Sequence, residues 1–247
     1  MVHEKSAFYD VAGFKAGKTT LNPLELEELG DVKNKTLLHL QCHFGLDTLS
    51  WAREGAKVTG IDFSEKAITL AKNLAEELSL DARFICSDVY ALPENLQGRF
   101  DVVFTSYGAL PWLPNLEKWA NVVAHFLKPG GVFYLAEFHP VLWMFDNDMR
   151  RLTYPYFNHG AIVEEANGTY ADRDAPICNQ EITWNHGLGE VISALTGQGL
   201  RIEFVHELPY SFYNAFASAV RAADGFYRLK NYENILPLTY SIRATKR

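Results

Sequence analysis

From residue 35 onward, hydrophobic and polar positions alternate between two patterns. Short apolar runs are typical of strands buried on both faces, and each is followed by a segment whose apolar residues recur at helical spacing. The clearest helix is 64–80, in which apolar residues from Ala67 to Leu78 share one face and Ser64 is placed to cap the first turn. The pattern predicts further helices at 22–30, 46–55, 115–131 and 188–199. It predicts strands at 35–40, 56–63, 82–88, 100–107, 132–138, 200–208 and 238–246.

Strand–helix alternation with short links predicts an α/β fold with a doubly wound, seven-stranded, mostly parallel sheet. Residues 141–185 break this rhythm, being rich in Asn, Asp, Gly and aromatic residues, and indicate an insertion after the fifth strand. We expect one domain over 1–247. Its parts are an N-terminal lid and helix (1–34), a cofactor-binding core (35–140), an insertion covering the acceptor site (141–185), and the last helix with the terminal strands (186–247).

The first predicted helix, 22–30, has a clear start signal. Asn22 is placed to cap it, Pro23 suits its first position, and Glu25 falls where a capping box requires an acid. Gly30 is placed to end it. This arrangement predicts a short helix.

Composition narrows the functional classes. A net charge of −7, a pI near 5.6 and no basic stripe argue against nucleic-acid binding. The three cysteines are widely spaced, which favours a reduced, cytoplasmic protein. We expect no signal peptide, because residues 1–10 are polar, and no membrane partner, because no apolar run approaches ~18 residues.

In a doubly wound sheet, ligands bind at the carboxyl ends of the strands, where two acids lie. Asp62 ends the second strand, and an acid there can accept hydrogen bonds from both ribose hydroxyls of an adenosine-bearing cofactor. The alternative is an acid that only favours the N-terminus of the next helix. Asp88 follows the third strand and can accept from an adenine amino group, or can be a turn residue before Pro93.

The ordered motifs LLHLQCHFG, VTGIDFS, ARFICSDVYALP, FDVVFTSYGALPWL and FLKPGGVFYLAEFHP resemble those of class I S-adenosylmethionine-dependent methyltransferases. The resemblance covers 35–140, with a weaker match to the terminal strands, and is nearest to bacterial small-molecule methyltransferase-like proteins. It implies a Rossmann-like methyltransferase fold that uses S-adenosylmethionine and releases S-adenosylhomocysteine. Asp62 then matches the ribose acid, and Asp88 and Val89 match the adenine-contacting pair. We also expect cofactor contacts from Tyr9 in the lid and from Phe63 and Ser106 at strand ends.

The first motif departs from the usual Asp-x-Gly-x-Gly-x-Gly. His39 takes the place of the acid, Gln41 and His43 replace the first two glycines, and Gly45 matches the third. We expect a working turn in which Gln41 need not be left-handed and in which Gln41 and His43 donate to the cofactor's methionyl carboxylate. The alternative is that the two side chains fill and block the site.

Other cofactors fit less well. A nicotinamide site requires G-x-G-x-x-G after the first strand, and the turn offers only Gly45. We expect no metal site, because HxH, HExxH and Cys/His clusters are absent from the sequence. Cys42 fits a small core residue better than a catalytic thiol.

Methyl transfer from a sulfonium is an in-line displacement that mainly requires orientation and exclusion of water. Where a base assists, His139 and Tyr107 are the candidates nearest the strand ends, and His159 and His186 are weaker ones in loops. His139 can equally be a satisfied histidine before Pro140. The predicted activity is methyl transfer to a small-molecule acceptor. A protein that binds S-adenosylmethionine without transfer and a protein-directed methyltransferase stay as alternatives, and the acceptor atom and oligomeric state are open.

Overall fold

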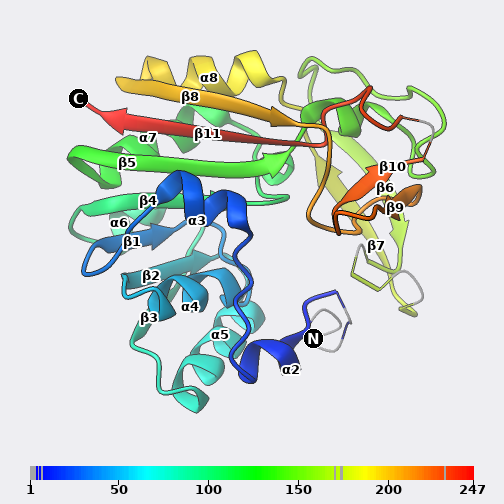
Figure 1. Ribbon diagram of the computed structural model, residues 1–247. Helices are drawn as coiled ribbons and strands as arrows, with labels where there is room; N and C mark the ends of the chain where they lie inside the picture. Colours follow the sequence, from blue (N-terminus) through cyan, green and yellow to red (C-terminus); the bar gives the residue numbers. More distant parts are fainter. Residues whose placement is uncertain (1–3, 5, 7, 170, 173–174, 231) are drawn as a thin grey trace.

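A seven-stranded sheet with strand order β3-β2-β1-β4-β5-β11-β8 forms the centre of the molecule (Figure 1). The computed structural model describes residues 4, 6, 8–169, 171–172, 175–230 and 232–247. The pairs from β3 to β5 are parallel, and β11 is antiparallel to both β5 and β8. This confirms the predicted seven-stranded, mostly parallel sheet. The strands are β1 Thr36–His39, β2 Lys57–Asp62, β3 Ala82–Cys86, β4 Phe100–Ser106, β5 Leu127–Phe138, β8 Leu200–Leu208 and β11 Thr239–Lys246.

The strand order reverses between β1 and β4. The chain winds outward from β1 to β3 and then returns to place β4 beside β1, with His39 opposite Phe104. A crevice opens at the carboxyl ends of the strands where such a reversal occurs. The fold therefore places a ligand site beyond residues 39, 62 and 106.

Helices cover both faces of the sheet (Figure 1). Buried residues of α7 and α8, such as Trp119 and Leu195, share one hydrophobic cluster with β4 and β5. Residues of α3 and α4 pack on the opposite face with Tyr134 of β5, and α5 packs there with Phe84 of β3. The helices are α2 Val11–Lys15, α3 Pro23–Leu29, α4 Leu46–Arg53, α5 Glu65–Glu77, α6 Leu92–Asn95, α7 Leu116–Phe126 and α8 Leu188–Gly197, with 3-10 turns η1 Leu110–Trp112 and η2 Pro140–Met144.

Two small antiparallel sheets lie beyond the carboxyl end of β5 (Figure 1). One pairs β6 (Ile162–Asn167) with β7 (Cys178–Thr183) inside the predicted insertion. The other pairs β9 (Ala219–Arg221) with β10 (Tyr227–Leu229), which the sequence pattern did not predict. Both sheets extend the molecule on the side where the crevice opens.

One local expectation is wrong at α3. Asn22 has extended backbone geometry at the N-cap but makes no capping hydrogen bond. Its side-chain amide instead donates to Glu25 Oε1 at 3.1 Å and to the Tyr213 hydroxyl at 3.1 Å. The Asn22 side chain therefore bonds to the Glu25 and Tyr213 side chains and not to the backbone of the first turn.

In the part of the chain that the structure describes, no helix is both long enough and apolar enough to cross a membrane.

Candidate functional site

The turn between β1 and α4 keeps the backbone geometry of a glycine-rich loop without its glycines. Gln41 and His43 have φ of 57° and 51°, so both are left-handed, although the sequence did not require this of Gln41. Each left-handed non-glycine residue costs roughly 1–2 kcal/mol. Backbone hydrogen bonds compensate, including Cys42 N–H to the Ile61 carbonyl at 2.7 Å and His43 N–H to Asp62 Oδ2 at 2.8 Å.

Gln41 spans from this turn to the loop after β4. Its Nε2 donates to the Ala109 carbonyl at 2.9 Å. Because a carbonyl only accepts, the orientation of the amide is settled, and Oε1 points elsewhere. Oε1 is buried without a hydrogen-bond partner among the described residues. The free end of Gln41 is thus an acceptor rather than the donor expected from the sequence.

Glu137, near the end of β5, holds the loop that Gln41 reaches. Its side chain is buried and accepts from the backbone N–H groups of Gly108, Ala109 (2.8 Å), Leu110 (3.1 Å) and Phe138 (2.7 Å). Burial raises the pKa of the carboxyl, while the four donors act in the opposite direction. Glu137 was not a candidate from sequence, because three of its four donors come from the loop after β4, which no local pattern reveals.

Asp62 closes the turn from β2. It is 8% exposed, and its Oδ2 and Oδ1 accept from the backbone of His43 (2.8 Å) and Ser64 (2.9 Å). Burial raises its pKa, and the two backbone donors lower it. Each carboxylate oxygen has a second lone pair. Asp62 can therefore brace the turn and still accept from a ligand hydroxyl.

The predicted adenine side lies next to Asp62. The ring of Phe63 is 78% exposed, which is unusual for phenylalanine and leaves an apolar face open at the edge of the site. Asp62 is the parallel-sheet neighbour of Cys86, which brings the turn after β3 alongside. In that turn Val89 is buried, and exposed Asp88 accepts from the Tyr90 N–H at 2.7 Å.

A chain of polar groups runs beneath the turn. His39 Nε2 lies 3.3 Å from Ser106 Oγ, which donates to Asp47 Oδ2 at 2.9 Å, and His39 Nδ1 lies 2.8 Å from Thr48 Oγ1. Ser106 uses its proton on Asp47, so His39 carries hydrogen on Nε2. Burial lowers the pKa of His39 to about 3, which keeps the ring neutral. Asp47, in the first turn of α4, places a carboxylate at the end of this chain of polar groups.

Two aromatic rings of the N-terminal segment lie against neighbouring parts of the site. The ring of Tyr9 lies 5.3 Å from that of His43 and 4.8 Å from that of Phe44. Phe8 stacks on Tyr213 at 5.8 Å. Phe14 of the same segment is buried in the core, with the Arg53 guanidinium 4.0 Å over its ring.

Tyr107 and His139 contact different groups. The Tyr107 ring follows β4 and packs against Phe138 and Tyr213, with centroids at 5.5 and 4.8 Å. His139 Nε2 pairs with Glu207 Oε1 at 2.8 Å, and its Nδ1 accepts from the Val141 N–H at 3.2 Å. Burial lowers the pKa of His139, and Glu207 opposes this. Both ring nitrogens are thus engaged, so a role for His139 as base would require breaking one of these contacts, and that role stays a prediction.

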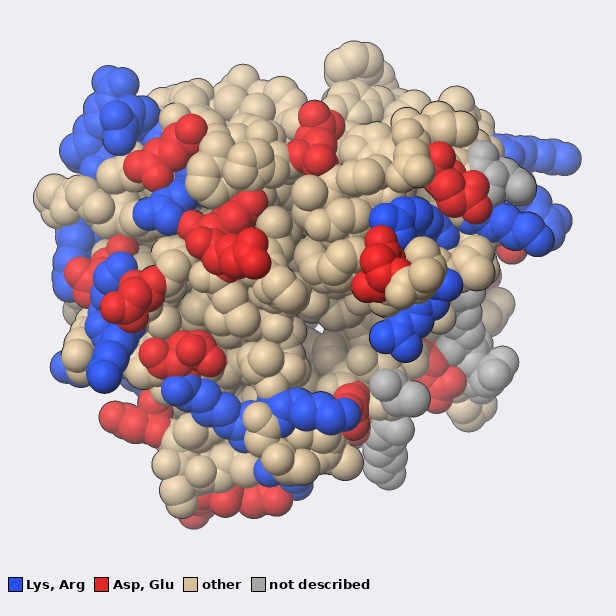
Figure 2. All heavy atoms as spheres, in the orientation of Figure 1, with Lys and Arg blue, Asp and Glu red and all other residues tan. Residues whose placement is uncertain are grey.

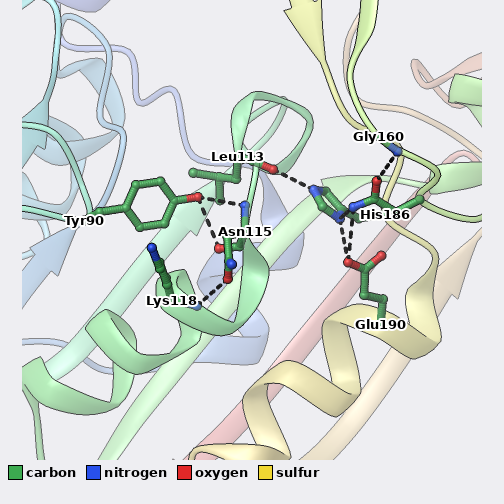
Figure 3. Close-up of polar contacts among 8 residues, drawn as sticks. Tyr90, Leu113, Asn115, Lys118, Gly160, His186 and Glu190 are labelled. Carbon is green, nitrogen blue, oxygen red and sulfur yellow. Dashed lines mark hydrogen bonds and ion pairs between the residues drawn. The ribbon is translucent and has the colours of Figure 1, made fainter.

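The other two histidines lie elsewhere. His159 is exposed. His186 is buried, with Nε2 donating to the Leu113 carbonyl at 2.7 Å and Nδ1 3.0 Å from Glu190 Oε1 (Figure 3). Figure 3 also shows Tyr90 bound to the backbone of Asn115 in the same region. These contacts join the loop before α7 to the start of α8, which is a bracing role.

The described residues contain no group of three or more His, Cys, Asp or Glu side chains arranged to hold a metal ion. The face in Figure 2 is hollowed near its centre, between the N-terminal elements and the small sheets. The residues around this crevice suit an organic ligand with hydroxyl and amino groups.

Comparison with known proteins points to one family. Residues 37–131 match the family model of a methyltransferase domain. The crystal structure of an S-adenosylmethionine-dependent methyltransferase from Clostridium acetobutylicum has a TM-score of 0.61 at 14% identity, covering all of this chain and 94% of that one. Residues 37–131 are thus similar to a methyltransferase domain, and the chain shares the fold of solved S-adenosylmethionine-dependent methyltransferases. The polar turn after β1 is therefore the first motif of such a domain.

Two further relatives are informative. Ubiquinone biosynthesis O-methyltransferase from Coxiella burnetii is 34% identical over 119 residues, or 47% of this chain and 50% of that protein. The chain thus spans about half the length of the curated relatives it matches. A glycopeptide N-methyltransferase crystallised with sinefungin has a TM-score of 0.59 at 14% identity, covering 91% of this chain and 85% of that one. Both support the methyltransferase fold of this domain.

Proposed function

We propose that this protein transfers a methyl group from S-adenosylmethionine to a small-molecule acceptor. The observation that carries the proposal is the unpartnered, buried Oε1 of Gln41, beside a left-handed turn closed by Asp62. A buried acceptor without a donor is unfavourable, and the α-ammonium of the cofactor is a suitable donor. Asp62 accepts from the ribose hydroxyls, Phe63 and Val89 contact the adenine, and Asp88 accepts from its amino group.

The bound cofactor supplies an activated methyl on a sulfonium, and the residues of this chain orient it and exclude water. Tyr9 covers the turn, and Ser106 with Asp47 places a buried carboxylate beside it. The rings of Tyr107, Phe138 and Tyr213 pack against one another and form an aromatic wall. Such a wall favours a partly apolar acceptor held at attack distance.

A small-molecule acceptor is supported by this wall and by the names of the relatives, one an O-methyltransferase and one a glycopeptide N-methyltransferase. The test supplies methyl-labelled S-adenosylmethionine with bacterial metabolite extract or, separately, with the extract's protein fraction. We expect label in the metabolites. Label only in protein would support a protein-directed enzyme, and binding without any transfer would support a sensor.

We expect Asp62→Ala to weaken S-adenosylmethionine binding about 10- to 100-fold. Hydrogen bonds to a charged group are worth about 1.5–3 kcal/mol each, and about 1.4 kcal/mol corresponds to a factor of ten. Isothermal titration calorimetry measures the change, with exposed Asp81→Ala as the matched control and a thermal melt to confirm folding. Unchanged affinity in a folded variant would remove Asp62 from the site.

Gln41→Ala tests the remodelled turn by the sign of its effect. If Oε1 accepts from the cofactor, we expect binding about 5- to 20-fold weaker, the loss of one hydrogen bond of about 1–2 kcal/mol. If Gln41 blocks the site, trimming it opens space and binding tightens. Titration of wild type, Gln41→Ala and His43→Ala distinguishes the two, and tighter binding in either variant would contradict a working turn.

A further inference from the structure

Glu25 lies in the first turn of α3 but is not a surface acid. An acid at this position usually faces solvent and interacts favourably with the helix dipole. The side chain is instead 1% exposed. Asn22 donates to its Oε1 at 3.1 Å, whereas Oε2 is buried without a hydrogen bond of standard geometry among the described residues, and the Tyr107 hydroxyl is its polar neighbour. A buried polar atom left unpaired is costly, and such violations of local rules concentrate at functional sites.

The surroundings of Glu25 are acidic and aromatic. Asp47 from α4, Tyr107 after β4, Tyr134 from β5 and Tyr213 after β8 all interact electrostatically with Glu25 or with its hydrogen-bond partner. Desolvation is the main cause that raises the pKa of Glu25 to about 8, and neither Lys nor Arg is among the causes. The Tyr107 hydroxyl is also buried without a hydrogen bond of standard geometry. The cluster therefore offers two polar oxygens and no cation.

Three contacts place this cluster at the cofactor turn. Asp47 accepts from Ser106, the residue directly before Tyr107. Asn22 joins Glu25 to Tyr213, and Phe8 of the N-terminal segment stacks on that tyrosine. The cluster thus lies between the turn, the N-terminal cover and the aromatic wall.

We propose that Glu25 is the proton acceptor of the methyl-transfer reaction, an inference that rests on the proposed function. Its Oε2 takes the proton of an acceptor that carries an ionisable hydrogen on oxygen or nitrogen. The freed electron pair of that atom attacks the methyl carbon, and the carbon–sulfur electrons leave on sulfur as a neutral thioether. Tyr107 donates to the same acceptor atom and orients it. A carboxyl that titrates near the working pH suits this task.

The test uses cofactor binding, so it requires no knowledge of the acceptor. S-adenosylmethionine carries a positive sulfonium, whereas S-adenosylhomocysteine is a neutral thioether of nearly the same shape. If Glu25 faces the sulfur, its ionised form favours the first ligand. Calorimetry at about pH 6.5 and about pH 9, on either side of the Glu25 pKa of about 8, gives the preference for S-adenosylmethionine at each pH. In wild type, we expect this preference to be about tenfold greater at the higher pH than at the lower one. A tenfold change corresponds to a Glu25 pKa that is about one unit lower with S-adenosylmethionine bound than with S-adenosylhomocysteine bound.

Glu25→Gln keeps the shape and cannot titrate, so its preference should lack this rise. Exposed Glu27→Gln, on the same helix, is the matched control and should behave like wild type. Ionisation of the ligands themselves is common to all three proteins and cancels in the comparison. An equal rise in wild type and Glu25→Gln would overturn the proposal. Failure of wild type to bind either ligand would instead contradict the proposed function.

An infrared measurement keeps the proposal testable if Glu25→Gln does not fold. The protonated-carboxyl band of the wild-type protein should titrate at lower pH with S-adenosylmethionine than with S-adenosylhomocysteine. Glu25→Asp should move that band and so assign it. Identical midpoints with the two ligands would also overturn the assignment.

Discussion

Glu137→Gln is expected to lower the melting temperature by about 10 °C. The carboxylate of Glu137 accepts from four backbone N–H groups in a site that is 1% exposed. An amide has one acceptor oxygen, and its NH₂ group faces donors, so at least one buried N–H loses its partner at about 1–3 kcal/mol. The remaining hydrogen bonds become weaker because the amide is neutral, so we expect the free energy of unfolding to fall by about 3–5 kcal/mol. For a chain of this size, each kcal/mol lowers the melting temperature by roughly 2–4 °C.

The same substitution should weaken cofactor binding. Glu137 holds Ala109, and the Ala109 carbonyl holds the amide of Gln41. Differential scanning calorimetry and a cofactor titration measure the two effects. Exposed Glu76→Gln is the control and should melt within about 1 °C of wild type, as expected for surface changes. A Glu137→Gln melting temperature within about 3 °C of wild type would show that the four donors do not depend on the carboxylate.

Gly45→Ala is expected to destabilise the protein by about 2–5 kcal/mol. Gly45 has φ of 84°, where a side chain costs roughly 1–2 kcal/mol. An added Cβ would also lie 2.7 Å from the Phe84 ring and 3.0 Å from the Ala71 Cβ, inside the packed core. Overpacking of this kind costs typically about 1–3 kcal/mol. Denaturant unfolding gives the total.

Gly199→Ala separates the two causes. Gly199 has a similar φ of 80°, and a Cβ there would meet nothing within 4 Å, so only the conformational cost applies. We expect Gly45→Ala to exceed this control by the overpacking cost. Combining Gly45→Ala with Phe84→Leu should give less destabilisation than the sum of the single changes, because the second change removes the clash. Equal effects at both glycines would show that Gly45 is required for its backbone conformation alone.

The sequence pattern was sufficient for the sheet. Apolar runs and helical spacing predicted all seven strands of the central sheet and the long helix α5, and the structure confirms them within a few residues. The exception is β5, which begins at Leu127 rather than at 132, because Leu127 already pairs with Phe100 of β4. The strands of both small sheets were missed. β6 and β7 lie inside the insertion, for which no strands were predicted, and β9 and β10 have only three residues each and so show no period of their own.

The candidate site was predictable only in part. The resemblance in motif order, together with the position of Asp62 at a strand end, pointed to an adenosine-bearing cofactor, and the family match agrees with it. The sequence did not show which groups the site residues would contact. Gln41 meets Ala109 across 68 positions, and Asp47 joins the polar groups beneath the turn through Ser106.

What the sequence by itself determined is the fold and the family, because hydrophobic periodicity follows from local backbone geometry and motif order follows from chain order. What only the tertiary structure decided is the chemistry of individual side chains. Glu25 lies in an acidic helix and Glu137 in an apolar strand, and neither setting shows that one has an oxygen beside Tyr107 without a standard hydrogen bond and the other has four donors. The pKa and function of such a group depend on desolvation and on partners brought from distant segments, and neither is encoded in any local pattern.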